Sequence, residues 1–82
     1  MPTLLRSEGL RVVIYPNDHR PAHVHVIGKS CEVVFNLNCH TGPVEVRENY
    51  RFSLREIRRI AVVLTERLVE LCAAWETIHG NA

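Results

Sequence analysis

Two histidines separated by one residue, His23 and His25, are the first side chains in this sequence that could carry chemistry. Residues two apart in an extended strand point to the same side, so both imidazoles should lie on one face of a sheet. An imidazole titrates near neutral pH and can move protons, and it is also a common ligand for transition metals. The pair therefore fits acid–base catalysis, metal binding, or a plain solvated sheet face.

The same alternation along the neighbouring predicted strands adds carboxylates and guanidinium groups to this face. The expected set is His23, His25, Glu32, Asn36, Glu45 and Arg47, with His19 and Arg20 at the rim. Imidazoles move protons and arginine stabilises negative charge on phosphate, which together suit metal-independent RNA cleavage. In that hypothesis His23 and His25 are the general acid and base, and Glu45 orients one histidine. Arg20 and Arg47 would hold the phosphate.

Two other interpretations of the histidines stay open. His19, His23 and His25 are weak candidate metal ligands, and the sequence predicts neither a bound metal nor another cofactor. Alternatively, the histidines belong to an ordinary polar face and pair with Glu32 and Glu45.

A cluster of arginines follows the last predicted strand. Arg51, Arg55 and Arg59 are spaced by four, and Arg51 lies just ahead of the predicted helix. Cations at a helix N-terminus oppose the macrodipole at roughly 0.3 to 1 kcal/mol each, so this placement favours an anionic partner such as RNA. The plain alternative is surface charge neutralised by nearby glutamates. The net charge of only +1 excludes a bulk electrostatic nucleic-acid binder, so any RNA site must be a local patch.

The periodicity predicts an α+β protein forming a single domain over residues 1–82. Ser53 and Glu56 form a capping-box signature and Gly80 is a helix stop, which predicts one helix over about 54–79. We expect this helix to pack on one face of a four-stranded antiparallel meander, in the order ββββα. The predicted strands cover about 11–15, 23–27, 31–37 and 44–48.

The predicted helix is too long for the sheet. At 1.5 Å per residue it would extend about 39 Å, whereas a strand of this sheet measures about 17–20 Å. A second apolar strip consists of Val62, Val69 and Ala73. It lies beside the apolar side of the helix that is expected to face the sheet. The strip predicts a homodimer or a hetero-oligomer with a protein partner. A break in the helix, or loops that cover the strip, is the alternative.

Composition limits the protein's class. A chain of 82 residues supports one modest core. Cys31, Cys39 and Cys72 have no CxxC or zinc-finger spacing, so we expect reduced thiols. The sequence contains neither the roughly 20 apolar residues of a membrane span nor a secretory signal, and a cytoplasmic location is expected.

The chain resembles the bacterial domain-of-unknown-function family 4160. The resemblance rests on the opening Met-Pro-Thr, residues 17–26, residues 42–50 and the helix end at 74–80, and it covers essentially the whole chain. Ala22 stands where the family commonly has a second proline. The family name implies no activity. The resemblance implies a small partner in a two-gene cassette, commonly beside a domain-of-unknown-function family 2442 protein, an arrangement suggestive of a toxin–antitoxin pair.

The leading hypothesis is a component of a prokaryotic toxin–antitoxin-like module that binds a small cognate protein and acts on RNA. A non-catalytic interaction module is the first alternative, and a metal-binding regulatory domain using His23 and His25 is the second.

Overall fold

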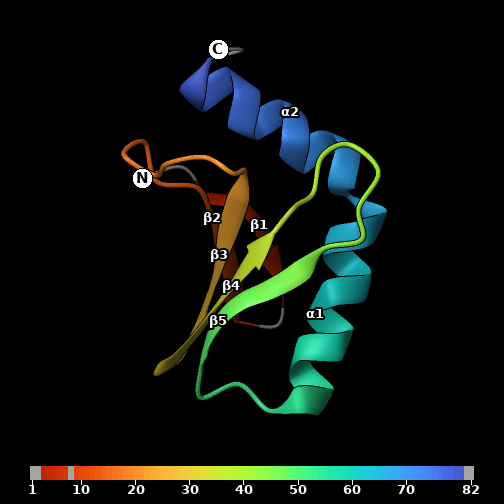
Figure 1. Cartoon of the computed structure of the whole chain (residues 1–82). Coiled ribbons are helices and arrows are strands. Elements are labelled where there is room, and N and C mark those ends of the chain that lie inside the picture. The colour runs from red at the N-terminus through yellow and green to blue at the C-terminus, as the bar shows by residue number, and fades with distance from the viewer. Residues whose placement is uncertain (1–2, 8, 81–82) are drawn as a thin grey trace.

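The computed structural model describes residues 3–7 and 9–80 as a single antiparallel sheet with two helices on one side (Figure 1). The strands lie in chain order, so every neighbouring pair is joined by a local connection. The elements are β1 Thr3–Ser7, β2 Leu10–Val13, β3 His23–Gly28, β4 Cys31–Asn36, β5 Glu45–Tyr50, α1 Leu54–Glu66 and α2 Leu68–His79.

The predicted four-stranded meander with one long C-terminal helix is wrong. The expected helix over 54–79 is divided at Arg67 into α1 and α2. The described sheet also has a further edge strand, β1, which pairs with β2 through a turn where Gly9 has a φ of 79°. Each end of the remaining strands lies within two residues of the predicted one.

The core lies between the sheet and the helices. Val24 and Val26 of β3 pair with Phe35 and Val33 of β4, and all four are at most 1% exposed. Directly opposed residues in an antiparallel pair share a face, so this block forms the floor beneath the helices. Each such buried side chain contributes roughly 1.5–3 kcal/mol relative to exposure.

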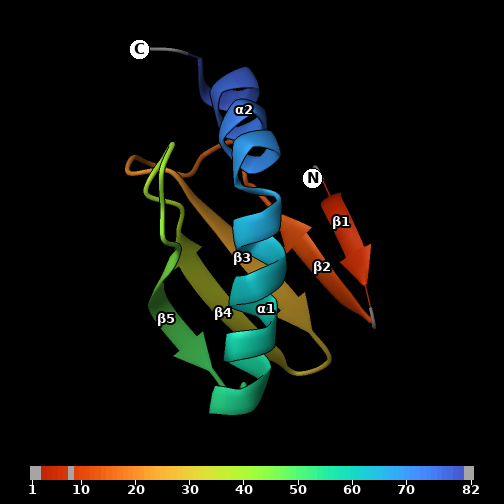
Figure 2. The same cartoon turned by 90° about the vertical axis from the view of Figure 1, so that its right-hand side faces the viewer.

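Helix α1 begins at a capping box and covers this floor. The Ser53 hydroxyl accepts a hydrogen bond from the Glu56 backbone N–H at 3.1 Å, and the Glu56 carboxylate accepts one from the Ser53 N–H at 3.0 Å. Ile57, Ile60 and Leu64 point into the core at spacings of three and four. Figure 2 shows α1 lying in front of the strands.

The helix breaks at Arg67 without a proline or glycine. One turn earlier, the Thr65 hydroxyl donates to the Ala61 carbonyl at 2.8 Å, a contact that often bends helices. The Arg67 N–H bonds to the Leu64 and Thr65 carbonyls, which tightens the last turn of α1. Helix α2 then tilts across the end of the sheet (Figures 1 and 2). The break turns α2 toward the start of β3, where Trp75 contacts His23.

A disulfide fixes α2 in this position. Cys39, in the β4–β5 loop, is bonded to Cys72 of α2 with the two Cα atoms 5.9 Å apart. The prediction of three reduced thiols is therefore wrong for this pair, while Cys31 is free. The partners are 33 residues apart and form no spacing motif, so only the tertiary fold brings them together.

Neither helix in the described part of the chain has the length and apolar character that a membrane span requires.

Candidate functional site

The two histidines of β3 lie on the side of the sheet turned away from the core floor, as their spacing predicts. Their ring centroids are 5.3 Å apart. The surroundings differ from the predicted open polar face, because Val13 and Val34, opposite His25 on the two neighbouring strands, are only 0% and 4% exposed. His23 itself is 5% exposed. The site is a partly buried cluster of polar groups with apolar neighbours.

Asp18 joins the two imidazoles. Its carboxylate lies 3.5 Å from His23 Nε2 and 3.2 Å from His25 Nε2. The same carboxylate accepts a hydrogen bond from the Tyr15 N–H at 3.0 Å, so the turn after β2 holds it in place. Sequence reasoning assigned Asp18 only to that turn. Its position five residues before His23 and seven before His25, across a short connection, was the available signal.

The other ring nitrogens are occupied by acceptors. His23 Nδ1 lies 2.8 Å from the Pro21 carbonyl oxygen, which can only accept, so Nδ1 carries the proton. His25 lies between two carboxylates, since its Nδ1 is 2.9 Å from Glu32 and its Nε2 is 3.2 Å from Asp18, so either nitrogen can donate. The Nε2 atoms of both histidines face Asp18.

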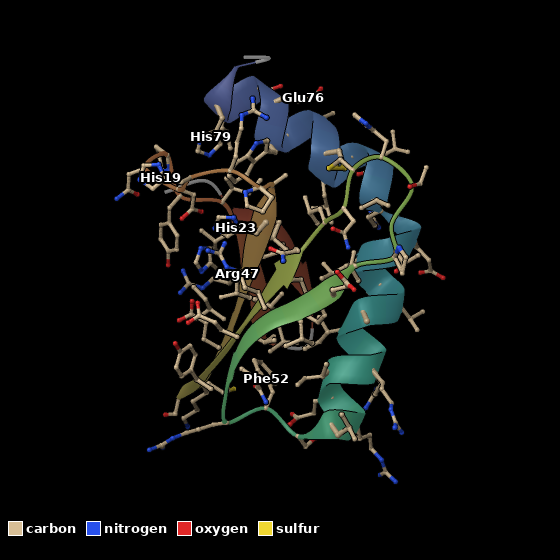
Figure 3. The ribbon with its side chains drawn as sticks, in the orientation of Figure 1. His19, His23, Arg47, Phe52, Glu76 and His79 are labelled. Atoms are coloured by element: carbon tan, nitrogen blue, oxygen red, sulfur yellow. A yellow bond between two sulfur atoms is a disulfide. The ribbon has the colours of Figure 1, made fainter. Side chains whose placement is uncertain are left out.

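Helix α2 packs against this cluster. The Trp75 ring centroid lies 5.3 Å from that of His23, and His79 stacks on Trp75 with ring centroids 3.8 Å apart. Figure 3 shows His79 on α2 at the same end of the sheet as His23. Two contacts hold α2 to the loops around it: Arg20 donates to the Gly80 carbonyl at 3.4 Å, and His40 lies 3.3 Å from the Glu76 carboxylate.

Three buried polar atoms near these elements have no hydrogen-bond partner among the described residues: Asn36 Oδ1, Trp75 Nε1 and His79 Nε2. Buried polar groups are normally paired, so each such atom calls for an explanation, including an unseen ligand or water.

The predicted orienting carboxylate, Glu45, contacts a different residue. It is exposed and accepts a hydrogen bond from Asn38 Nδ2 at 3.0 Å. The carboxylates that contact His25 are those of Asp18 and Glu32.

The five predicted phosphate-binding arginines lie in separate places. Arg47 is the extra residue of a bulge in β5 and lies on the side of the sheet away from α1 (Figure 3). Arg20 contacts the end of α2. Arg51, with a φ of 75°, begins the turn into α1, and Arg55 and Arg59 are exposed in that helix. The structure therefore brings Arg51, Arg55 and Arg59 near one another but not to the histidines.

His19 is exposed and lies outside the one group of potential metal ligands found in the described part of the chain, which is Asp18, His23 and His25.

Two surface groups have shifted pKa values. The hydrogen bond that Tyr50 donates to Glu48 raises the pKa of the Tyr50 hydroxyl, and the charge of Glu48 adds to this. The hydrogen bond from the Ser53 backbone, followed by that from its side chain, lowers the pKa of Glu56. Glu56 lies at the start of α1, whereas Tyr50 lies opposite Glu32, the carboxylate that contacts His25.

The predicted apolar strip is exposed. Val62 is 59% and Val69 72% exposed, and Ala73 is also exposed. Leu54 and Val63, at 63% and 42%, add to the apolar side chains that the described helices present to solvent.

These features define a small α+β protein with a five-stranded antiparallel sheet and a histidine–carboxylate cluster next to its last helix. The chain belongs to the family described as Domain of unknown function (DUF4160), whose family model matches residues 9–76. This match covers β2 to most of α2, including Asp18, His23 and His25 but not His79. No curated protein and no solved structure matches the chain.

Proposed function

We propose that the protein is one component of a toxin–antitoxin-like module and binds a small cognate protein through the outer surface of its two helices. We define this outer helix surface as Val62, Val69 and Ala73. The observation that carries the proposal is the exposure of two valines, 59% and 72%, on helices whose inner sides already fill the core. Apolar side chains grouped in this way are typical of protein-binding surfaces.

The charges around Val62 indicate the chemistry of the partner. Arg58 and Arg55 lie four and seven residues before Val62 in α1, so they share its side of the helix. A complementary surface would combine apolar side chains with a rim of carboxylates. The family resemblance supplies the candidate: a domain-of-unknown-function family 2442-like protein encoded beside this one. A second copy of this chain is the competing occupant.

Replacement of an outer valine by aspartate tests this proposal. Val69→Asp should weaken binding of the cognate protein at least tenfold, because the new carboxylate would be desolvated in the complex. Thr41→Asp, which adds the same charge in the exposed β4–β5 loop, is the matched control. Affinity is measured by calorimetry with the purified partner, and light scattering detects a homodimer. Equal affinity of both variants and wild type, or a wild-type homodimer dispersed by Val69→Asp, would contradict the proposal.

RNA is the second candidate partner. It is favoured by the exposed arginines at the start of α1, because guanidinium groups bind phosphate in a bidentate manner. Among the histidines proposed as acid and base, His25 is the more accessible, with a 16% exposed side chain against 6% for His23. In this proposal, the arginines at the start of α1 hold RNA by its phosphates, and the histidines remain the predicted acid and base at a separate place on the molecule.

Arg55→Gln should weaken binding of a labelled single-stranded RNA and reduce the salt dependence of that binding. Arg67→Gln is the matched control, since it neutralises another exposed arginine at the helix break. Fluorescence anisotropy at several salt concentrations gives both quantities. Equal losses in the two variants would indicate nonspecific attraction and remove RNA as a specific partner.

A further inference from the structure

We propose that Asp18, His23 and His25 form a binding site for a divalent transition-metal cation. The ligand atoms are a carboxylate oxygen of Asp18 and Nε2 of each histidine. One ligand atom from each residue lies within 4.8 Å of the other two. The site is independent of the proposed partner surface and does not require RNA.

The second ring nitrogen of each histidine is hydrogen-bonded in the way that is typical of metal-binding histidines. Such a histidine almost always donates its other ring N–H to a carbonyl or carboxylate, which fixes the tautomer and the ring orientation. His23 donates to the Pro21 carbonyl at 2.8 Å, and His25 Nδ1 lies 2.9 Å from Glu32. Both Nε2 atoms therefore face the Asp18 carboxylate, and when they carry no proton their lone pairs are directed to a cation placed between the three side chains.

The separations suit a metal ion. Two ligands at about 2.0–2.1 Å from a tetrahedral zinc lie about 3.3 Å apart. Asp18 lies 3.5 Å from His23 Nε2 and 3.2 Å from His25 Nε2. The charges also match, since a divalent ion would be balanced by the carboxylates of Asp18 and Glu32. The separation of the two histidine ligand atoms is at most 4.8 Å, so a small movement of the two rings toward each other would complete the site.

The ligand types favour a transition metal over magnesium or calcium. Magnesium and calcium prefer sites made wholly of oxygen, whereas two imidazoles and one carboxylate suit zinc, iron, cobalt or nickel. The three side chains are only 6–16% exposed, so the surrounding protein would limit access of solvent to the ion.

Three protein ligands leave one coordination position for water or a substrate, as in catalytic zinc sites. Asn36 is directly opposite His23 on β4 and therefore shares its face. Its Oδ1 is buried without a partner among the described residues. This oxygen is an acceptor for a metal-bound water, which would account for its missing hydrogen bond.

Trp75 provides a built-in reporter of binding. It is the single tryptophan of the chain, and its ring centroid lies 5.3 Å from that of His23. A paramagnetic ion such as Co²⁺ at this distance should quench its fluorescence, and the visible absorption of bound Co²⁺ reports nitrogen and oxygen ligands in a four-coordinate site.

The test uses the full chain, purified without a histidine tag, treated with chelator and titrated separately with Zn²⁺ in a calorimeter and Co²⁺ in a fluorimeter. We expect equimolar binding, quenching of Trp75, and a loss of affinity of at least tenfold in Asp18→Asn and in His25→Gln. The Asp18→Asn side chain keeps an oxygen for the Tyr15 N–H. His40→Gln is the matched control, since it removes another histidine that faces a carboxylate, and it should bind as wild type does.

Two further variants exclude other ligands. Cys31→Ser removes the free thiol and His19→Gln removes the nearest other histidine in sequence; both should retain binding. Circular dichroism checks that every variant is folded. Absence of equimolar binding in the wild type would overturn the proposal even if Asp18→Asn fails to fold. Equal losses in His40→Gln or His19→Gln would also overturn it, because they would show adventitious binding to surface histidines. Neither result bears on partner binding, which is measured at the outer helix surface.

Discussion

Helices α1 and α2 are separated by a single residue, yet they contribute differently to the molecule. Helix α1 starts at a complete capping box and buries Ile57, Ile60 and Leu64 over the valine floor of the sheet. Helix α2 has no side-chain cap at its start; it buries Leu68, Leu71, Cys72 and Trp75 in the same core and is also held by a disulfide and by loop contacts. Its Trp75 also contacts the histidine–carboxylate cluster. Both helices therefore stabilise the fold, and α2 alone also contributes to the site.

Replacement of Trp75 should change stability most and should also show which helix contributes to the site. Trp75→Ala should lower the free energy of unfolding by about 3–5 kcal/mol, because a large side chain that is 2% exposed is removed. It should also weaken Co²⁺ binding, since His23 loses its cover. Leu64→Ala in α1 should cost about 2–5 kcal/mol and leave the metal affinity of the folded protein unchanged.

Urea denaturation measures the stabilities, and Trp75→Phe is available if the alanine variant does not fold. Equal metal affinities in the Trp75 and Leu64 variants would refute the division of roles.

Reduction of the Cys39–Cys72 bond should give the next largest effect. A cross-link that closes a loop of 33 residues is expected to contribute about 3–4 kcal/mol through the entropy of the unfolded chain. The melting temperature should therefore fall in reductant. A thiol-specific reagent in denaturant should titrate one thiol before reduction and three after it. The Cys31→Ser variant should show the same dependence on reductant; three thiols before reduction would disprove the bond.

Loss of the cap of α1 should have a smaller effect. Ser53→Ala removes the hydroxyl that accepts the Glu56 N–H and should cost about 1 kcal/mol. Thr77→Ala, in α2, removes a hydroxyl that donates to the Ala73 carbonyl and serves as the control, with a change near zero expected. Chemical denaturation followed by circular dichroism makes the comparison. Identical losses at the two sites would argue against a special role for the box.

The smallest expected effect is a dependence on pH. Hydrogen bonds from Ser53 hold the pKa of Glu56 below its ordinary value. A carboxyl group whose pKa is lowered by folding stabilises the folded state above the unfolded pKa, and that contribution is lost as the pH falls through the lowered pKa. Glu56→Gln should therefore lose less stability than wild type on acidification from about pH 6 to pH 3. Parallel pH profiles would contradict this assignment.

Local patterns in the sequence predicted the regular parts of the fold. Alternation located β3 and β4, and Ser53 with Glu56 located the start of α1. Strand β1 was missed because Thr3–Ser7 lacks alternation, and the helix break was missed because Arg67 has no proline or glycine beside it. Both depend on tertiary packing, which periodicity does not record.

The site was predictable only in part, for a related reason. The spacing of His23 and His25 identified their shared face, since strand geometry is local. Asp18 already had a role in a turn, so nothing indicated that its carboxylate reaches both rings. The expected partner Glu45 bonds to Asn38, because the loop between β4 and β5 turns back on itself. Contacts between side chains on different loops depend on the tertiary structure and leave no local pattern in the sequence.

The Cys39–Cys72 bond also determines which elements can carry mechanical tension. When the two ends of the chain are pulled, force passes from residue 39 directly to residue 72 through the sulfur atoms, and β5 and α1 lie inside the bypassed segment. Only strands β1 to β4 and the part of α2 that follows Cys72 then carry the pulling force. Reduction would release a hidden length of about 110–120 Å for these 33 residues, so stretching single molecules with and without reductant should give contours that differ by that amount.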